Sequence, residues 1–216
     1  MKLAILGSTG FVGAVLLKKA LTQGHQLKVL ARSPEKLGDA KDKVDIARGD
    51  MFDPAALESL VQGVDAVISV AGPPMNAKFD VEKHARATQD LVYAMKNAQV
   101  NRLITITGAA AEVPGQKLGF KQSLLRFVLG TFVRPDVIKV KDMELKIIAA
   151  SGLNWTVIRP PLIGSGNATG SVAASEADMT GMKIDVEDIA DFILSLLKTN
   201  EWDCKAPIVS SNPTRR

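Results

Sequence analysis

The stretch KLAILGSTGFVG, residues 2–13, decides the fold of this chain. An apolar run at residues 3–6 stops at a glycine, and a helical pattern starts at Phe11. Between them lie three glycines spaced G-x-x-G-x-x-G, namely Gly7, Gly10 and Gly13. In a strand-turn-helix unit, the first glycine permits a tight turn, the second admits a pyrophosphate and the third allows close helix packing. The helix N-terminus then receives the phosphates, so this context favours a dinucleotide site over a turn without a ligand.

The composition indicates a single folded domain. The 216 residues are 46% hydrophobic and 23% charged, which suits one core and not a disordered chain. The net charge of +4 is scattered, so we expect no nucleic-acid partner, although the excess suits an anionic cofactor. One cysteine, Cys204, argues against a disulfide framework or a cysteine-rich metal site. No apolar stretch approaches the roughly 18 residues of a membrane span, and residues 3–6 are too short for a signal peptide. We therefore expect a cytoplasmic protein with no membrane partner and no metal.

Strand and helix patterns alternate along the rest of the chain. Expected strands cover residues 26–31, 44–47, 65–70, 102–107, 156–158 and 207–210. Expected helices cover residues 12–21, 78–98, 136–151 and 186–198, with another that starts at Pro54 behind its N-cap Asp53. This alternation requires a parallel sheet, so the fold class is α/β: a single-domain Rossmann fold, doubly wound, with helices on both faces. Residues 1–216 are predicted to form one NAD(P)-binding domain, with ligands at the carboxyl ends of the strands.

The residues after the second expected strand indicate the cofactor. An NAD site has an Asp or Glu there to hold the ribose 2′-hydroxyl. Here Arg32 and Ser33 take that place, and the first acid, Glu35, follows a proline. An arginine can bind a 2′-phosphate through two N–H groups, whereas a carboxylate would repel it. The sequence favours NADP, as NADPH, over NAD; the alternative for Arg32 is a solvated surface residue.

Further candidate contacts follow the later strands. Asp50 can accept a hydrogen bond from the adenine amino group, and Met51 can lie against the ring. The small residues Ala71 and Gly72, followed by Pro73, let backbone pass close to the ribose and nicotinamide.

The alternating pattern breaks at residues 112–135, which we expect to be a variable helical insertion near the substrate pocket. Apolar and basic side chains mix there as in a short amphipathic helix: Phe120, Leu124, Leu125, Phe127, Val128 and Phe132 among Lys117, Lys121, Arg126 and Arg134. Core packing or a subunit contact is one interpretation, and a mobile cover over the pocket is the other. Residues 164–175 are expected to form a flexible rim, residues 212–216 a frayed tail, and Asp185 to cap the last helix.

The ordered set of motifs resembles the atypical short-chain dehydrogenase/reductase superfamily, within it the NmrA-like and flavin-reductase/biliverdin-IXβ-reductase branch. The matching pieces are GSTGFVG, ARS, GDMFDP, SGLNWTVIRPP and DVEDIADFI, which together reach from residue 1 to about residue 197. The resemblance implies that the glycine motif binds pyrophosphate, that Arg32 binds the 2′-phosphate, and that the turn after the sixth strand lies by the nicotinamide carboxamide. The complete set of candidate cofactor-binding residues is Gly7, Ser8, Thr9, Gly10, Phe11, Val12, Arg32, Ser33, Asp50, Met51, Ala71, Gly72, Pro73, Thr107, Gly108, Lys141, Pro160, Pro161, Leu162 and Ile163.

One departure from the superfamily bears on activity. Many members use Tyr-x-x-x-Lys with an upstream Ser, the tyrosine protonating the developing alkoxide. Lys141 stands at the lysine position, but Val137 precedes it by four residues, and the only tyrosine, Tyr93, lies on another helix. The expected hydroxyl is at best Thr107. Because a general acid contributes about 10²- to 10⁴-fold, ordinary alcohol dehydrogenase chemistry is not expected.

Lys141 is the only candidate catalytic residue, as a contact to a ribose hydroxyl; a solvated lysine is the alternative. His84 is expected about two turns into its helix, packed or facing solvent. His25 precedes the second strand, away from the crevice.

The sequence is compatible with two functions. The first is an NADPH-dependent reductase of a small planar acceptor, such as a flavin, a quinone or a tetrapyrrole-like compound. Such an acceptor takes hydride at a ring atom and a proton from water. Residues 120–132 with Pro73, Pro74 and Leu162 would form its apolar pocket. The alternative is an NmrA-like, non-catalytic NADP-sensing regulatory protein; an epimerase- or dehydratase-like activity would need an acid or base that we do not find. A monomer and a homodimer are both compatible with the sequence.

Overall fold

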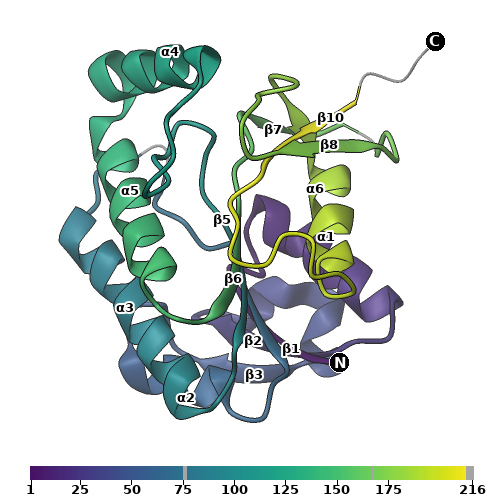
Figure 1. Ribbon diagram of the computed structural model, residues 1–216. Helices are drawn as coiled ribbons and strands as arrows, with labels where there is room; N and C mark the ends of the chain where they lie inside the picture. The colour runs from purple at the N-terminus through teal and green to yellow at the C-terminus, as the bar shows by residue number, and fades with distance from the viewer. Residues whose placement is uncertain (75–76, 167, 213–216) are drawn as a thin grey trace.

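A six-stranded parallel sheet forms the centre of the protein in the computed structural model. The structure describes residues 1–74, 77–166 and 168–212, and it leaves out the side chains of residues 132 and 133. The strand order of the sheet is β3-β2-β1-β4-β5-β6 (Figure 1). The strands are β1 (Lys2–Leu6), β2 (Gln26–Ala31), β3 (Asp45–Arg48), β4 (Ala66–Ser69), β5 (Arg102–Ile106) and β6 (Asn154–Ile158). All of their pairings are parallel, which confirms the predicted doubly wound sheet. Of the tail predicted at 212–216, residues 213–216 lie outside the described residues.

Helices cover both faces of this sheet (Figure 1). Helices α1 (Phe11–Thr22) and α6 (Val186–Ser195) pack together on one face, and α2 (Pro54–Val61), α3 (Val81–Asn97) and α5 (Pro135–Ala149) pack on the other. Each face has its own apolar core, so β1 sends Leu3 and Ile5 into one core and Ala4 and Leu6 into the other. Burial on both sides explains why residues 3–6 of β1 are all apolar and do not alternate with polar ones.

The turn after β1 depends on its glycines. Gly7 has φ +83°, and a Cβ there would lie 2.7 Å from the backbone nitrogen of Ala71. A Cβ at Gly13 would lie 1.9 Å from the carbonyl oxygen of Gly7. The predicted roles of Gly7 in the turn and Gly13 in close packing are therefore confirmed. The helix α1 begins against the turn at a distance that no larger residue permits.

One predicted helix start and one predicted helix cap differ from the structure. Helix α3 begins at Val81 and not at residue 78, because the Asp80 side chain accepts a hydrogen bond from the Lys83 N–H at 3.0 Å and caps the helix. His84 consequently lies in the first turn of α3. Asp185 occupies the N-cap position of α6, but its carboxylate does not cap the helix; it pairs with Lys183 at 2.8 Å instead. The predicted cap at Asp53 is confirmed by a 3.0 Å hydrogen bond from Ala55.

Residues 164–175, expected as a flexible rim, contain strand structure. Strand β8 (Val172–Ser175) pairs antiparallel with β10 (Ile208–Ser211), and β7 (Ile163–Gly164) pairs with β9 (Ile184–Asp185). Buried Asp188 of α6 accepts hydrogen bonds from Thr169 and Ser211 at 2.7 and 2.6 Å. Burial alone would raise the pKa of Asp188, but these bonds hold it below its usual value. They tie the segment to α6.

The insertion contains α4 (Phe120–Val128) followed by the π-helix η2 (Leu129–Val133), and η1 (Pro34–Lys43) follows β2. None of the helices within the described ranges has both the length and the apolar content of a membrane span.

Replacing Gly13 by alanine should destabilise the fold, because the new methyl group would overlap the Gly7 carbonyl. We expect Gly13→Ala to lower the free energy of unfolding by at least about 2 kcal/mol, measured by urea denaturation. Gly108→Ala is the matched control, since a Cβ there meets nothing within 4 Å. Equal unfolding midpoints for the two variants would contradict the close contact.

Candidate functional site

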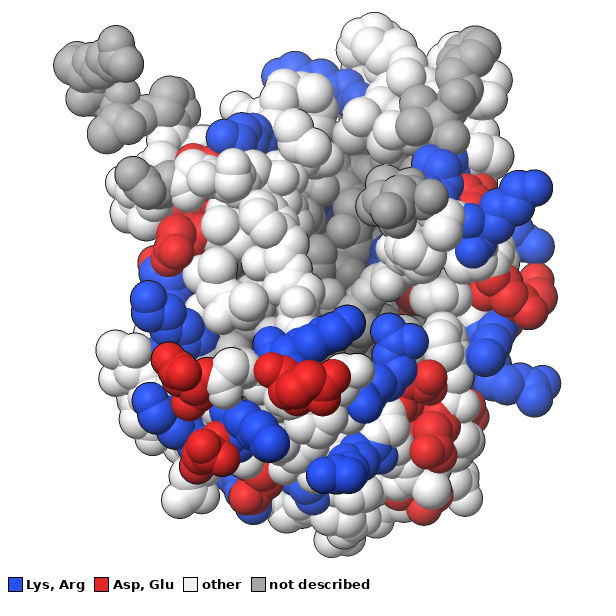
Figure 2. Space-filling model, turned by 180° about the vertical axis from the view of Figure 1, so that it is seen from behind, with Lys and Arg blue, Asp and Glu red and all other residues white. Residues whose placement is uncertain are grey.

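The carboxyl ends of the central strands meet at one edge of the sheet, where β1 and β4 are neighbours and the chain order reverses. Seen from behind, the molecule is deeply hollowed between two raised regions (Figure 2). The Gly7 turn, which follows β1, contacts Ala71, which follows β4. These two segments therefore lie side by side at this edge of the sheet. Segments far apart in the sequence are thus brought together as predicted, and such a switch point is where open α/β sheets bind ligands.

One end of this crevice is the start of α1. Gly10 is the N-cap, so no side chain caps the first N–H groups, and the first turn contains no acidic residue. The N-terminus of α1 therefore remains able to bind an anion. Ser8 is 1% exposed, and its buried Oγ has no partner among the described residues.

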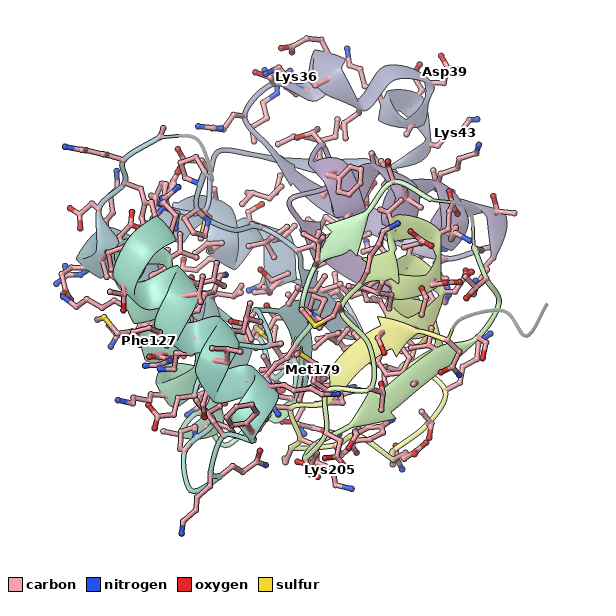
Figure 3. All side chains as sticks on the ribbon, turned by 90° about the horizontal axis from the view of Figure 1, so that it is seen from above. Lys36, Asp39, Lys43, Phe127, Met179 and Lys205 are labelled. Carbon is pink, nitrogen blue, oxygen red and sulfur yellow. The ribbon has the colours of Figure 1, made fainter. Side chains whose placement is uncertain are left out.

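Arg32 and Ser33 follow β2 and begin the segment that leads into η1. Arg32 is exposed, and no carboxylate within the described ranges pairs with it. Lys36 lies on η1 at one end of the molecule, and Phe127 and Met179 lie far from it in the view from above (Figure 3). An unpaired guanidinium at the η1 end suits an anionic group there.

Asp50 and Met51 follow β3 and lie half-buried. Asp50 Oδ1 already accepts a 2.8 Å hydrogen bond from the Phe52 N–H, so one oxygen shapes its own turn. Met51 packs against the core on the α2 side. Sequence reasoning assigned both residues to the adenine without foreseeing these structural roles.

The ends of β5 and β6 stay side by side beyond the sheet. Thr107 donates its N–H to Ile158 at 2.9 Å, and Ala109 donates to Pro160 at 3.0 Å. The Thr107 Oγ1 is buried with no partner among the described residues. Leu162, two residues beyond Pro160, is 62% exposed. The predicted carboxamide turn thus adjoins an unsatisfied hydroxyl.

A buried arginine fixes that turn, which sequence reasoning missed. Arg159 is 1% exposed and donates to the carbonyls of Ala206 at 2.6 Å and Glu176 at 3.1 Å. Burial lowers the pKa of Arg159 to about 10. The only sequence signal was an arginine placed directly between an apolar strand and two prolines.

Lys141 is not a solvated lysine. Its Nζ lies 2.9 Å from Glu144 Oε2, and the two side chains are only 13% and 12% exposed. The same Nζ lies 3.7 Å from where a Cβ on Gly72 would stand. The surface interpretation is therefore wrong, and α5 brings an ammonium group to the end of β4.

His84 packs behind this pair and is 5% exposed. The rings of Phe52 and Phe79 approach it edge-on, with centroid distances of 4.9 and 5.0 Å. Its buried Nδ1 has no partner among the described residues, and burial lowers the pKa of His84 below its ordinary value. Burial therefore favours the neutral form of this imidazole.

The apolar stripe of α4 faces solvent. Phe120, Leu124 and Val128 are 85%, 55% and 42% exposed, so the core-packing interpretation is wrong for them. The polar Gln122, on the opposite side of the helix, is buried. The prediction that these three apolar side chains help to line the substrate pocket stays a prediction, and the side chain of Phe132 lies outside the described residues.

The inner side of α4 attaches to two other parts of the chain. Leu125 packs with Met179 and Ala109, and Arg126 pairs with Asp142 of α5 at 2.7 Å. Figure 3 shows Met179 beside α4 and Phe127 on the opposite side of that helix. Two further hollows, of about 530 and 610 Å³, lie along α5, one against α4 and one against α3.

The residues present fit a nicotinamide dinucleotide. The Ser8 and Thr107 hydroxyls, which have no partner in the described part of the chain, lie at the ends of β1 and β5 with an uncapped helix start and the Lys141 ammonium. By contrast, Tyr93 is 63% exposed on α3, and Val137 holds the tyrosine position. The crevice has groups to bind such a cofactor and no tyrosine to protonate an alkoxide.

Comparison with known proteins also indicates an NAD(P)H-binding protein. A family model described as NAD(P)H-binding matches residues 7–200. The (4-alkanoyl-5-oxo-2,5-dihydrofuran-3-yl)methyl phosphate reductase of Streptomyces griseus is 26% identical over 215 residues, covering 95% of this chain and 66% of that protein. The chain spans between 32% and 66% of the length of the first curated relatives it matches.

Two solved structures share the fold. A short-chain dehydrogenase/reductase from Veillonella parvula, in complex with NADP, superposes with a TM-score of 0.80 at 15% identity, covering 100% of this chain and 96% of that one. A proposed NADH-flavin reductase from Streptococcus pneumoniae superposes with a TM-score of 0.76 at 20% identity, covering 98% of this chain and 100% of that one. At these identities, the likeness concerns the fold alone.

Acid should destabilise the protein through His84. Below the ordinary pKa of 6.5, the unfolded chain takes up a proton that the folded chain, with its lowered pKa, does not. Stability is therefore full above pH 6.5 and falls as the pH decreases, by up to about 1.4 kcal/mol per pH unit for one group.

Urea denaturation at pH 7 and pH 5.5 measures this loss. His84→Phe should reduce it, because phenylalanine does not titrate. His25 also has a pKa lowered by burial but is only half-buried, so His25→Phe is the matched control with a smaller effect. An unchanged pH dependence in His84→Phe would show that His84 does not contribute.

Proposed function

The chain belongs to the NAD(P)H-binding family, and from that premise we propose that it is an NADPH-dependent reductase of a planar, conjugated acceptor such as a flavin or a quinone. Its membership confirms the resemblance to the atypical short-chain dehydrogenases/reductases. One observation carries the proposal. Lys141 is held at the end of β4, while Val137 occupies the position of the tyrosine that donates the proton in a Tyr-x-x-x-Lys pair.

This arrangement restricts the chemistry. NADPH, when bound, supplies the hydride. The Gly7 turn and the start of α1 would hold the pyrophosphate, and the turn at Pro160 would orient the nicotinamide end. A conjugated acceptor delocalises the arriving charge over its ring system and can take its proton from water. A carbonyl oxygen would need a positioned acid in the transition state.

The curated relative from Streptomyces griseus supports a conjugated acceptor. The substrate in its name is a 2,5-dihydrofuran with oxo and alkanoyl groups, in which the ring double bond is conjugated with carbonyls. Such a compound, like a flavin or quinone, is planar around the bond that accepts hydride.

We also propose that Arg32 binds the 2′-phosphate, so that NADPH is preferred over NADH. Residues 1–216 act as one domain in which the segment 112–135 is a variable insertion. The protein is cytoplasmic. It is a monomer or a homodimer, without nucleic-acid or membrane partners.

The test is NADPH consumption, followed by absorbance, with FMN, riboflavin, simple quinones and a linear tetrapyrrole. Saturable turnover of one of these acceptors is the expected result. Tight NADPH binding without turnover of any acceptor would contradict the reductase.

Tight NADPH binding without turnover is the result that a non-catalytic NADP sensor would give. The exposed stripe of Phe120, Leu124 and Val128 favours this second candidate, because apolar side chains turned to solvent suit a surface that binds another molecule. A partner complex that forms only with NADP or only with NADPH would establish it.

Removing Arg32 should abolish the cofactor preference. We expect Arg32→Ala to lower kcat/KM for NADPH by about 10- to 100-fold, since a charge-assisted hydrogen bond contributes about 1.5–3 kcal/mol, and to leave NADH unchanged. Arg86→Ala is the control: Arg86 is also exposed, but it lies on α3 and carries the same charge. Equal losses with both cofactors would refute the role of Arg32.

A further inference from the structure

Helix α5 places Lys141 and Glu144 on one face, three residues apart. Their side chains form a 2.9 Å ion pair that is almost closed to solvent, with exposures of 13% and 12%. Another ion pair of α5, between Lys139 and Glu82 of α3, has a 3.2 Å distance but exposures of 62% and 69%. Helix α5 therefore takes part in two Lys–Glu ion pairs, one shielded from solvent and one exposed to it.

The buried pair sits where the chain leaves β4. The Lys141 Nζ is 3.7 Å from the position of a Cβ on Gly72, whose own Cα carries no side chain to intervene. Ala71, the residue before Gly72, also lies against the Gly7 turn. The Lys141 ammonium group thus has the crevice on one side and the Glu144 carboxylate on the other.

An ammonium this far from water needs an anionic partner to remain charged and fixed. Glu144 is that partner, and it uses one of the three N–H donors of Lys141. Two donors remain for hydroxyl groups of a ligand in the crevice. Burial lowers the pKa of the nearby His84, which disfavours an imidazolium that would compete with Lys141 for the carboxylate.

We propose that Glu144 is a positioning residue, which holds the Lys141 ammonium at the end of β4 so that it can donate to the hydroxyls of the nicotinamide ribose. The inference rests on the proposed function, in that it requires the cofactor to lie in this crevice. Glu144 itself does not touch the cofactor. Its effect passes entirely through Lys141.

The experiment measures the dissociation constants of two ligands. NADPH carries both riboses, whereas adenosine 2′,5′-bisphosphate carries the 2′-phosphate but lacks the nicotinamide ribose. We expect Glu144→Gln to weaken NADPH binding about tenfold, the loss of one well-placed charged contact, and to change bisphosphate binding less than about twofold. Lys141→Met should behave likewise. Glu82→Gln, which removes the solvated pair, should change neither ligand.

The double variant tests whether the effect passes through Lys141. In a Lys141→Met background, Glu144→Gln should cause no further loss of NADPH affinity. A loss as large as in the wild-type background would overturn the proposal, as would equal weakening of both ligands, which indicates damage to the fold. NADPH affinity unchanged in Glu144→Gln would refute the inference alone. Failure of the wild-type protein to bind NADPH would refute the proposed function and, with it, this inference.

Discussion

The contact between the turn after β1 and the chain leaving β4 is the constraint on which the rest of the structure depends. Gly7 adopts a positive φ, its Cα faces the backbone of Ala71, and Gly13 brings α1 against the Gly7 carbonyl. Any side chain at these points would separate the two strands where the sheet order reverses. Because they remain close, the start of α1 opens directly onto the crevice, and the end of β4 forms its neighbouring wall.

The two ends of the crevice differ in how their charges are held. At the η1 end, Arg32 is exposed and has no carboxylate partner among the described residues, so an arriving anion meets a free guanidinium. At the α5 end, Lys141 is shielded from most solvent and already neutralised by Glu144. A free surface charge gives attraction and discrimination between anions, whereas a buried pair gives a fixed direction to its remaining donors. The first suits recognition of a phosphate, and the second suits orientation of neutral hydroxyls.

Local patterns predicted the elements whose residues are buried or capped by near neighbours. The strands of the central sheet and the helices between them carry runs and periodicities that a short window contains, and Asp53 caps its helix through residues two and three positions away. Strands β7, β8 and β9 were missed because they have two to four residues, and because β8 pairs with β10, which is distant in sequence. The amphipathic character of α4 was correctly predicted. The sequence left the direction of its apolar side open, since periodicity defines a stripe without saying which side meets the protein.

The sequence by itself determined the glycine turn, the basic residue after β2 and the lack of a tyrosine four residues before Lys141. These are properties of residue type and spacing, and no folding is needed to read them. Only the tertiary structure decided that Lys141 is buried against Glu144, that His84 packs between two phenyl rings, and that the apolar side of α4 faces outward. Burial and pairing depend on which distant segments the fold places beside a residue. That arrangement is set by the packing of all the elements together and not by any one of them.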